Sequence, residues 1–223
     1  MHWRMPFWCL LGALIVPDPS SAGVIRGTLK ALTALPAAPT MHTSYFGRAR
    51  ELPVAPTIVR GALSDAVVWV ETVPAGADGP VAHPDSLPVL AQQGKAFVPR
   101  VLAVAVGTTV DMPNYDPFYH NVFSLSPVKR FDLGKYPRGQ SRRVTFEHPG
   151  LVNVYCDIHS SMAAYVLVLP HHVFVRPDAR GAFALPPLPA GPYILRVWHP
   201  DFPALQREVV IPEQGDALVE LAL

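Results

Sequence analysis

Proline is the residue that most constrains this chain, because it occurs 26 times in 223 residues and is spread along the whole sequence. Proline breaks regular structure, and here it stands, together with 15 glycines, between short apolar runs. Several of these runs alternate apolar and polar side chains, as half-buried β-strands do. No stretch after the N-terminal segment has the length and period of an ordinary helix. The sequence therefore predicts an all-β fold with many turns.

The alternating runs place the expected strands. The clearest is Ala66–Thr72, a row of β-branched and aromatic residues. Residues 126–140 carry proline, glycine and charge and are expected to form an irregular loop, and residues 148–150 are expected to turn a hairpin. Strands at this spacing suggest a Greek-key sandwich or barrel. The expected strands are 23–32, 66–72, 101–106, 109–112, 121–125, 142–146, 151–156, 163–169, 182–185, 193–198, 209–212 and 217–223.

Residues 1–22 have the features of a signal peptide. Arg4 stands near the start of an apolar run, Met5–Val16, and Ser20-Ser21-Ala22 then supplies small residues for cleavage. The run is short for a bilayer span, so no membrane span is expected after cleavage. The sequence thus predicts a secreted, periplasmic protein.

The charge of the chain is low and balanced, with 18 basic and 17 acidic side chains. No basic stripe is present, so nucleic acid is not an expected partner. The sequence also contains no phosphate-binding glycine loop, no H-E-x-x-H motif, no paired carboxylates and no Ser-His-Asp order. We therefore do not expect an enzyme.

Cleavage would remove Cys9 and leave Cys156 as a single thiol, which is unusual in an oxidising compartment. Metal ligation is one explanation, and a buried apolar cysteine is the alternative. Cys156 opens the sequence C-D-I-H-S-S-M, so His159 and Met162 follow it at intervals of three. His120, in D-P-F-Y-H-N-V-F-S, precedes another expected strand, and a sandwich topology can return it to the side of Cys156.

A thiolate, two imidazoles and a weak thioether are the ligand set of a blue-copper site, which changes its geometry little between Cu(I) and Cu(II). The sequence therefore predicts one type-1 copper ion. Zinc fits less well, because one thiolate with a methionine is a poor tetrahedral set. Without a metal, Cys156 and Met162 would pack in the core and the histidines would lie at the surface. The predicted ligands are His120, Cys156, His159 and Met162.

Residues 96–169 resemble the cupredoxins, the plastocyanin and amicyanin family. The matching pieces are F-V-P-R-V-L-A-V-A-V-G-T-T-V, M-P-N-Y-D-P-F-Y-H-N-V-F-S, F-D-L-G and C-D-I-H-S-S-M, the last with an amicyanin-like short spacing. The resemblance implies the same four ligands, and it implies that Asn121 ties the strand of the first ligand to the cysteine loop. It also implies that His159 is the edge that meets redox partners. The expected apolar patch around that edge is Pro117, Phe118, Ala163 and Ala164.

One position departs from the family pattern. Asp157 follows the cysteine, where cupredoxins more often carry a small hydroxyl or another neutral residue. A carboxylate buried near the sulfur would favour Cu(II).

Residues 178–198, D-A-R-G-A-F-A-L-P-P-L-P-A-G-P-Y-I-L-R-V-W, are similar to the carboxypeptidase regulatory-like (transthyretin-like) sandwich. The first strands of that family match residues 23–27 and 66–70, and Trp69 and Trp198 are expected to fill its core. The similarity implies that a cupredoxin domain is inserted into a smaller β-sandwich, a layout similar to bacterial methylamine-utilisation-type proteins. Two domains in series are the alternative. The expected boundaries are 23–83 and 171–223 for the sandwich and 84–170 for the cupredoxin.

These observations together predict a periplasmic blue-copper protein that carries single electrons between redox partners. A cytochrome c or a periplasmic oxidoreductase is the expected kind of partner. The alternatives are a copper storage or delivery module and a domain that has kept the fold without the redox role.

Overall fold

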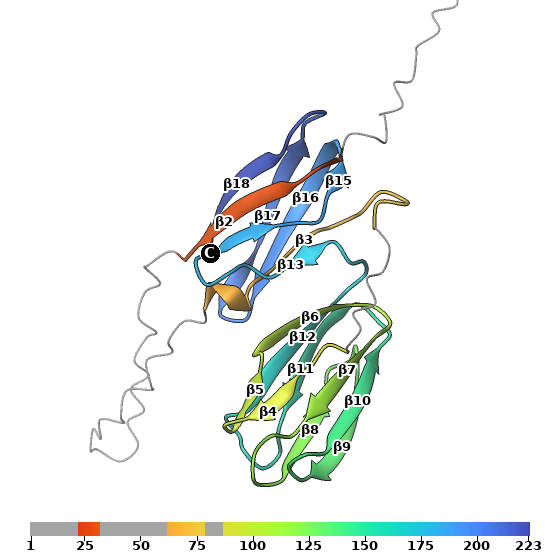
Figure 1. The fold of residues 1–223 in the computed structure, drawn as a ribbon, viewed down its shortest axis with the longest axis vertical. Coiled ribbons are helices and arrows are strands. Elements are labelled where there is room, and N and C mark those ends of the chain that lie inside the picture. Colours follow the sequence, from red (N-terminus) through yellow and green to blue (C-terminus); the bar gives the residue numbers. More distant parts are fainter. Residues whose placement is uncertain (1–21, 32–61, 79–86) are drawn as a thin grey trace, which may run out of the picture.

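The computed structural model describes residues 22–31, 62–78 and 87–223 (Figure 1). The expected signal peptide therefore lies outside the described residues, apart from Ala22. The described chain is all-β, as the sequence predicts, and its single helical element is a 3-10 turn at Leu63–Asp65. No helix in these ranges is long and apolar enough to cross a membrane.

Strands between residues 87 and 169 pair with one another, and we call this part the inner unit. Its main sheet is antiparallel except for the parallel pair β6 and β12. Apolar side chains of this sheet pack against those of two further strand pairs and enclose one core. The sheet order is β6 (Val101–Ala105), β12 (Ala163–Leu169), β11 (Gly150–Tyr155), β8 (His120–Ser124) and β9 (Phe131–Tyr136). The further pairs are β7 (Thr108–Pro113) with β10 (Ser141–Phe146), and β4 (Ala91–Gln93) with β5 (Ala96–Val98).

Two expectations for this unit are wrong. Residues 126–140 are not an irregular loop throughout, because they contain β9, whose Phe131 and Leu133 pack against the core and whose Tyr136 lies inside it. The turn at residues 148–150 does not make a hairpin, because β10 pairs with β7 whereas β11 pairs with β12 and β8. The turn instead carries the chain from one layer of the core to the other.

Strands before residue 78 and after residue 171 also pair with one another, and we call this part the outer unit. It is a sandwich of a three-stranded and a four-stranded sheet around its own core, with one short additional pair. The smaller sheet is β14 (Ala182–Ala184), β2 (Ile25–Lys30) and β18 (Ala217–Ala222). The larger is β13 (Phe174–Val175), β3 (Val67–Val70), β16 (Gly191–His199) and β17 (Phe202–Ile211), and the short pair is β1 (Ala22–Gly23) with β15 (Leu188–Pro189).

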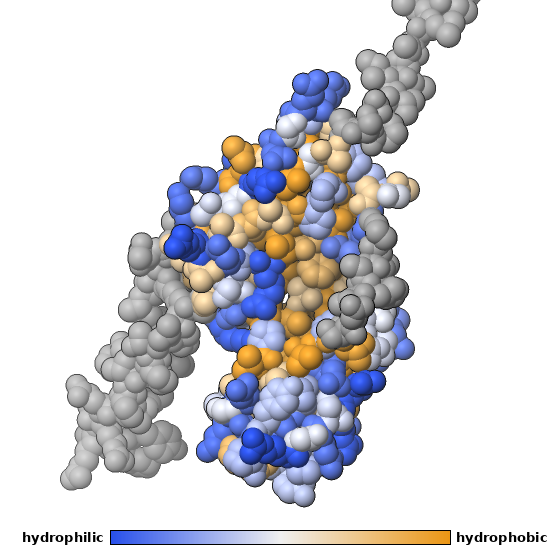
Figure 2. Space-filling model, in the orientation of Figure 1, coloured by the Kyte–Doolittle hydropathy of each residue, from blue (hydrophilic) through white to orange (hydrophobic). Residues whose placement is uncertain are grey.

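The two units meet through an apolar cluster that joins the outward faces of two sheets, and Figure 2 shows hydrophobic residues at this waist. Trp69 and Trp198 belong to this contact and not to the sandwich core, because β3 buries Val68 and Val70 on its other face. Tyr165 of β12 meets Trp198 with ring centroids 5.6 Å apart. Both strand faces of β3 are therefore covered, which explains its nearly continuous apolar sequence.

Candidate metal centre

Three neighbouring strands bring the predicted ligands together. His120 begins β8, Cys156 directly follows β11, and Met162 directly precedes β12. Since β11 lies between β8 and β12 in the sheet, the ends of these strands meet at one place. The loop between β11 and β12 is closed by backbone hydrogen bonds from Met162 to His159 (3.0 Å) and from Cys156 to Met162 (3.3 Å). This tight loop places the thiol beside the loop imidazole.

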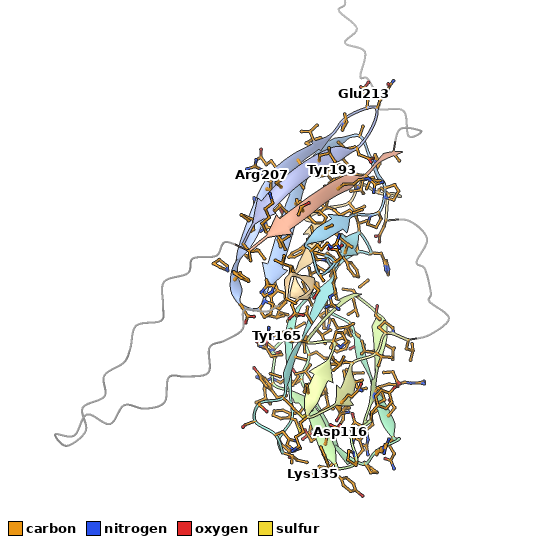
Figure 3. The ribbon with its side chains drawn as sticks, turned by 60° about the vertical axis from the view of Figure 1, so that its left-hand side comes forward. Asp116, Lys135, Tyr165, Tyr193, Arg207 and Glu213 are labelled. Atoms are coloured by element: carbon orange, nitrogen blue, oxygen red, sulfur yellow. The ribbon has the colours of Figure 1, made fainter. Side chains whose placement is uncertain are left out.

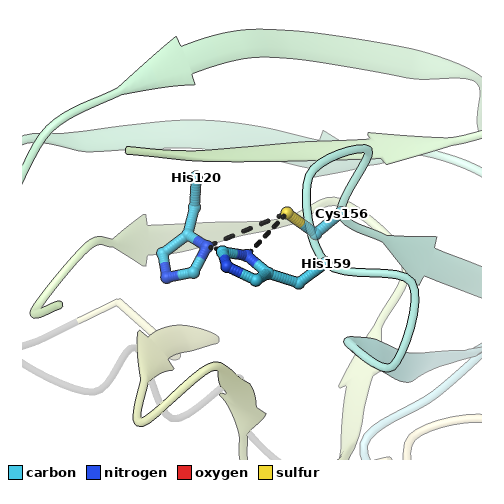
Figure 4. A group of neighbouring side chains, drawn as sticks. All are labelled: His120, Cys156 and His159. Carbon is cyan, nitrogen blue, oxygen red and sulfur yellow. Dashed lines mark hydrogen bonds between the residues drawn. The ribbon is translucent and has the colours of Figure 1, made fainter. Parts of the chain in front are cut away.

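The side chains of His120, Cys156 and His159 point their ligand atoms at one another (Figure 4). The Cys156 Sγ atom lies 3.8 Å from His120 Nδ1 and 3.9 Å from His159 Nδ1, and the two Nδ1 atoms are 3.2 Å apart. His120 is fully buried and Cys156 is nearly so, whereas His159 is half-buried. The alternative in which both histidines lie at the surface is therefore wrong for His120.

These distances suit a single first-row metal ion. Bonds of about 2.0–2.1 Å to nitrogen and about 2.3 Å to sulfur, at near-trigonal angles, separate nitrogen from sulfur by about 3.8 Å. The described side chains match that separation without movement. Two imidazole nitrogens and a thiol sulfur converge within 4.8 Å of one another, an arrangement that can hold one cation. The donor set of two imidazoles and one thiolate fits copper.

Met162 completes the predicted set by position. Its side chain is 1 % exposed and belongs to the same core cluster as Cys156. Its backbone bonds to His159 and Cys156 fix it at the end of the ligand loop. Of the predicted ligands Met162 and His159, His159 is therefore the one that is open to solvent. The role of Met162 as a weak fourth ligand stays a prediction.

Asp116, which the sequence does not single out, contacts the edge of the His120 ring that faces away from Cys156 and His159. Asp116 Oδ2 lies 2.8 Å from His120 Nε2, so the carboxylate can accept the Nε2–H; in that tautomer of the neutral ring, Nδ1 is the nitrogen that can bind a metal. Burial opposes ionisation of Asp116, but hydrogen bonds from Lys95, His120 and Gly94 outweigh it and hold its pKa below the usual value. The feature of the sequence that could have indicated this contact is the position of Asp116, four residues before a predicted ligand histidine.

Asn114 holds the loop that carries Asp116 and His120. Its side chain is fully buried, and its Nδ2 donates to the backbone carbonyls of Phe118 and Tyr136, each at 2.9 Å. Its Oδ1 accepts the backbone N–H of Asp116, also at 2.9 Å. One side chain therefore fixes the loop before β8 at two points and ties it to the end of β9 at a third.

Two further expectations change. The Asn121 side chain donates to Asp132 of β9 at 2.7 Å, and its own Oδ1 is buried without a partner, so it ties β8 to β9 and not to the cysteine loop. The Asp157 side chain is 45 % exposed and lies 3.7 Å from Lys135. The condition of a buried carboxylate near the sulfur is thus not met at Asp157.

The surface beside His159 is more aromatic than expected. The Phe118 ring lies 5.6 Å from the His159 ring, in agreement with the patch that the similarity to cupredoxins implies. Ala164, however, is 1 % exposed and cannot contribute to a surface patch. The exposed apolar side chains of the two ligand loops are instead Tyr115, Tyr119 and Ile158, with Pro117 between them.

No protein-family model and no curated protein sequence matches the chain. Among solved structures, the chain is similar to a mutant of amicyanin in its Cu(I) form, with 22 % identity over 46 % of this chain and 98 % of that one, at a TM-score of 0.36. The purple cupredoxin from Nitrosopumilus maritimus is 24 % identical over 38 % of this chain and its full length, at 0.34. The Cu-containing nitrite reductase from Thermus scotoductus is 28 % identical over 38 % of this chain, at 0.36, and the chain spans 22 % of its length.

Proposed function

We propose that residues 84–170 form a type-1 copper domain that carries single electrons and is inserted into the sandwich built from residues 23–83 and 171–223. The observation that carries the proposal is the convergence of one thiol and two imidazole nitrogens, all within 4.8 Å of one another. The pairing of β2 with β18 and of β3 with β16 supports the insertion, because strands from both ends of the chain share sheets.

His120, Cys156 and His159 would hold the copper ion, with Met162 as the weak fourth ligand. Copper supplies one-electron chemistry by cycling between Cu(I) and Cu(II) in a geometry that suits both states. The protein's own part is to hold the donors in place and exclude water. The burial of His120, Cys156 and Met162 supports both tasks, because buried side chains repack little when the charge at the centre changes.

The position of the centre supports exchange with a separate protein. In Figure 3, Tyr165 marks the contact between the units, and Asp116 lies toward the opposite end of the inner unit. The outer unit therefore leaves the half-exposed His159 and its aromatic surroundings open. A redox protein such as a cytochrome c or a periplasmic oxidoreductase is the partner we propose. Secretion to the periplasm after cleavage of residues 1–22 belongs to the same proposal.

Voltammetry on the copper-loaded protein tests the carrier function. A reversible one-electron couple is the expected result, since a pre-formed ligand set needs little rearrangement. A copper storage or delivery module is the second candidate, favoured by the partial exposure of His159, through which copper could pass to another protein. Tight Cu(I) binding without a reversible couple would contradict the carrier function and support delivery.

A further inference from the structure

A two-residue turn far from the ligand loop contacts the centre through one carboxylate. Gly94 and Lys95 connect β4 to β5 with φ values of 64° and 59°, the conformation of a tight hairpin turn. Their backbone N–H groups both donate to Asp116, at 2.7 Å to Oδ1 and 2.9 Å to Oδ2. Lys95 is the only residue other than glycine with positive φ in the described ranges. A positive φ strains the backbone of a residue that has a Cβ, and it persists only where the surrounding structure requires it. Residues in this conformation often lie at functional sites.

The same carboxylate contacts a proposed ligand. Asp116 Oδ2 receives the Nε2–H of His120 at 2.8 Å, so the carboxylate accepts three N–H donors. The Asp116 side chain is 8 % exposed and His120 is fully buried, so water screens this contact little. The turn holds the Asp116 carboxylate with the backbone N–H groups of Gly94 and Lys95. The Lys95 ammonium group itself lies over the Phe118 ring, 5.5 Å from its centre.

A buried anion that accepts an N–H from a ligand imidazole has two effects on the metal. It fixes the tautomer and the plane of the ring, and it makes the other nitrogen a stronger donor. A stronger donor and a nearby negative charge both stabilise Cu(II) more than Cu(I), because Cu(II) carries the larger positive charge. The one-electron reduction potential is lowered as a result.

We propose that Asp116, held by the β4–β5 turn, is the positioning residue that orients His120 and biases the copper centre toward Cu(II). This inference rests on the proposed function. It predicts that the reduction potential depends on a hairpin that contributes no ligand.

The test compares Asp116→Asn with Asp157→Asn, since both remove one carboxylate near the centre. Asp157 follows Cys156 directly but is 45 % exposed and pairs with Lys135, so Asp157→Asn controls for the loss of an exposed carboxylate beside the centre. For Asp116→Asn, Cu(II) affinity should fall by about 10- to 100-fold, the range found when partners of metal ligands are removed. Each tenfold loss of Cu(II) affinity relative to Cu(I) affinity raises the potential by about 59 mV. For Asp157→Asn we expect less than about a threefold change.

Equal shifts in the two variants would overturn the inference, as would a lower potential in Asp116→Asn. If Asp116→Asn does not fold, nitrogen-15 NMR of the wild-type Cu(I) protein supplies a second test. A His120 Nε2–H that exchanges slowly with solvent is expected, and a deprotonated or rapidly exchanging Nε2 would refute the contact. A wild type that shows no reversible copper couple would instead contradict the proposed function, so the two failures are distinguishable.

Discussion

Replacing Asn114 with alanine should loosen the proposed copper centre without changing any of the proposed ligands. The Asn114 side chain makes three hydrogen bonds, each 2.9 Å long, to backbone groups of Asp116, Phe118 and Tyr136. A typical intramolecular hydrogen bond contributes about 1 kcal/mol net, so the three together contribute about 3 kcal/mol. Because Asn114 is fully buried, water cannot easily replace these bonds, and the free energy of unfolding should fall by about that amount.

Urea unfolding followed by far-ultraviolet circular dichroism measures this change. The matched control is Asn153→Ala on β11, a half-buried asparagine whose backbone N–H, at 2.9 Å from Ser126 Oγ, survives the substitution. We expect the control to change stability by less than about 0.5 kcal/mol. Copper affinity should fall in Asn114→Ala and stay unchanged in the control, since of these two side chains it is Asn114 that fixes the loop of His120. A loss of stability below about 1 kcal/mol in Asn114→Ala would refute the reasoning.

Three further predictions concern the outer unit and its contact with the inner one. Arg100→Gln removes an ion pair in which both Arg100 and Asp201 contribute two atoms, each contact being 2.8 Å, and the free energy of unfolding should fall by about 1–2 kcal/mol, a value limited by the partial exposure of Arg100. Fluorescence of the interface tryptophans during urea unfolding measures the change. Burial holds the pKa of His199 below its usual value, so the unfolded chain binds the proton more readily and the stability of the protein should fall as the pH drops below about 6.5. Between about pH 7.5 and 5.5, the urea midpoint of His199→Gln should therefore fall less than that of the wild type. Gly181 has a positive φ, and a Cβ there would collide with a backbone carbonyl of β2, so Gly181→Ala should lower the free energy of unfolding by about 3 kcal/mol in thermal denaturation. Gly76→Ala, at a similar φ but in open space, should lower it by about 1 kcal/mol.

The clustering of His120, Cys156 and His159 can be predicted from the sequence because these residues follow local rules. Cys156, His159 and Met162 share one seven-residue loop, and alternation marks the strands on either side of it. His120 requires only that its strand lie in the same sheet, which β8 does. Donors of rare types at close spacing are therefore visible in the sequence itself.

The contacts that support the ligands cannot be predicted in the same way. Asp116 contacts a turn more than twenty residues earlier in the chain, and no local pattern indicates which carboxylate a backbone N–H will bind. Strand β9 escapes prediction because Gly134 and the proline after Tyr136 resemble a loop, although Tyr136 is buried by tertiary packing. The sequence predicts Trp69 in the sandwich core, but Trp69 lies in the contact between the two units. Alternation shows which side chains share a face of a strand, but it does not show which part of the protein covers that face.

The most direct test of the central claim is a titration of the purified protein with Cu(II), followed by visible absorption. An intense blue or green band that saturates at one copper per chain is the predicted result, because the Cys156 thiolate would transfer charge to bound Cu(II). Cys156→Ser should bind Cu(II) without that band, while Asp157→Asn should keep it. A band of equal strength in Cys156→Ser, or none in the wild type, would contradict a type-1 copper site at these residues.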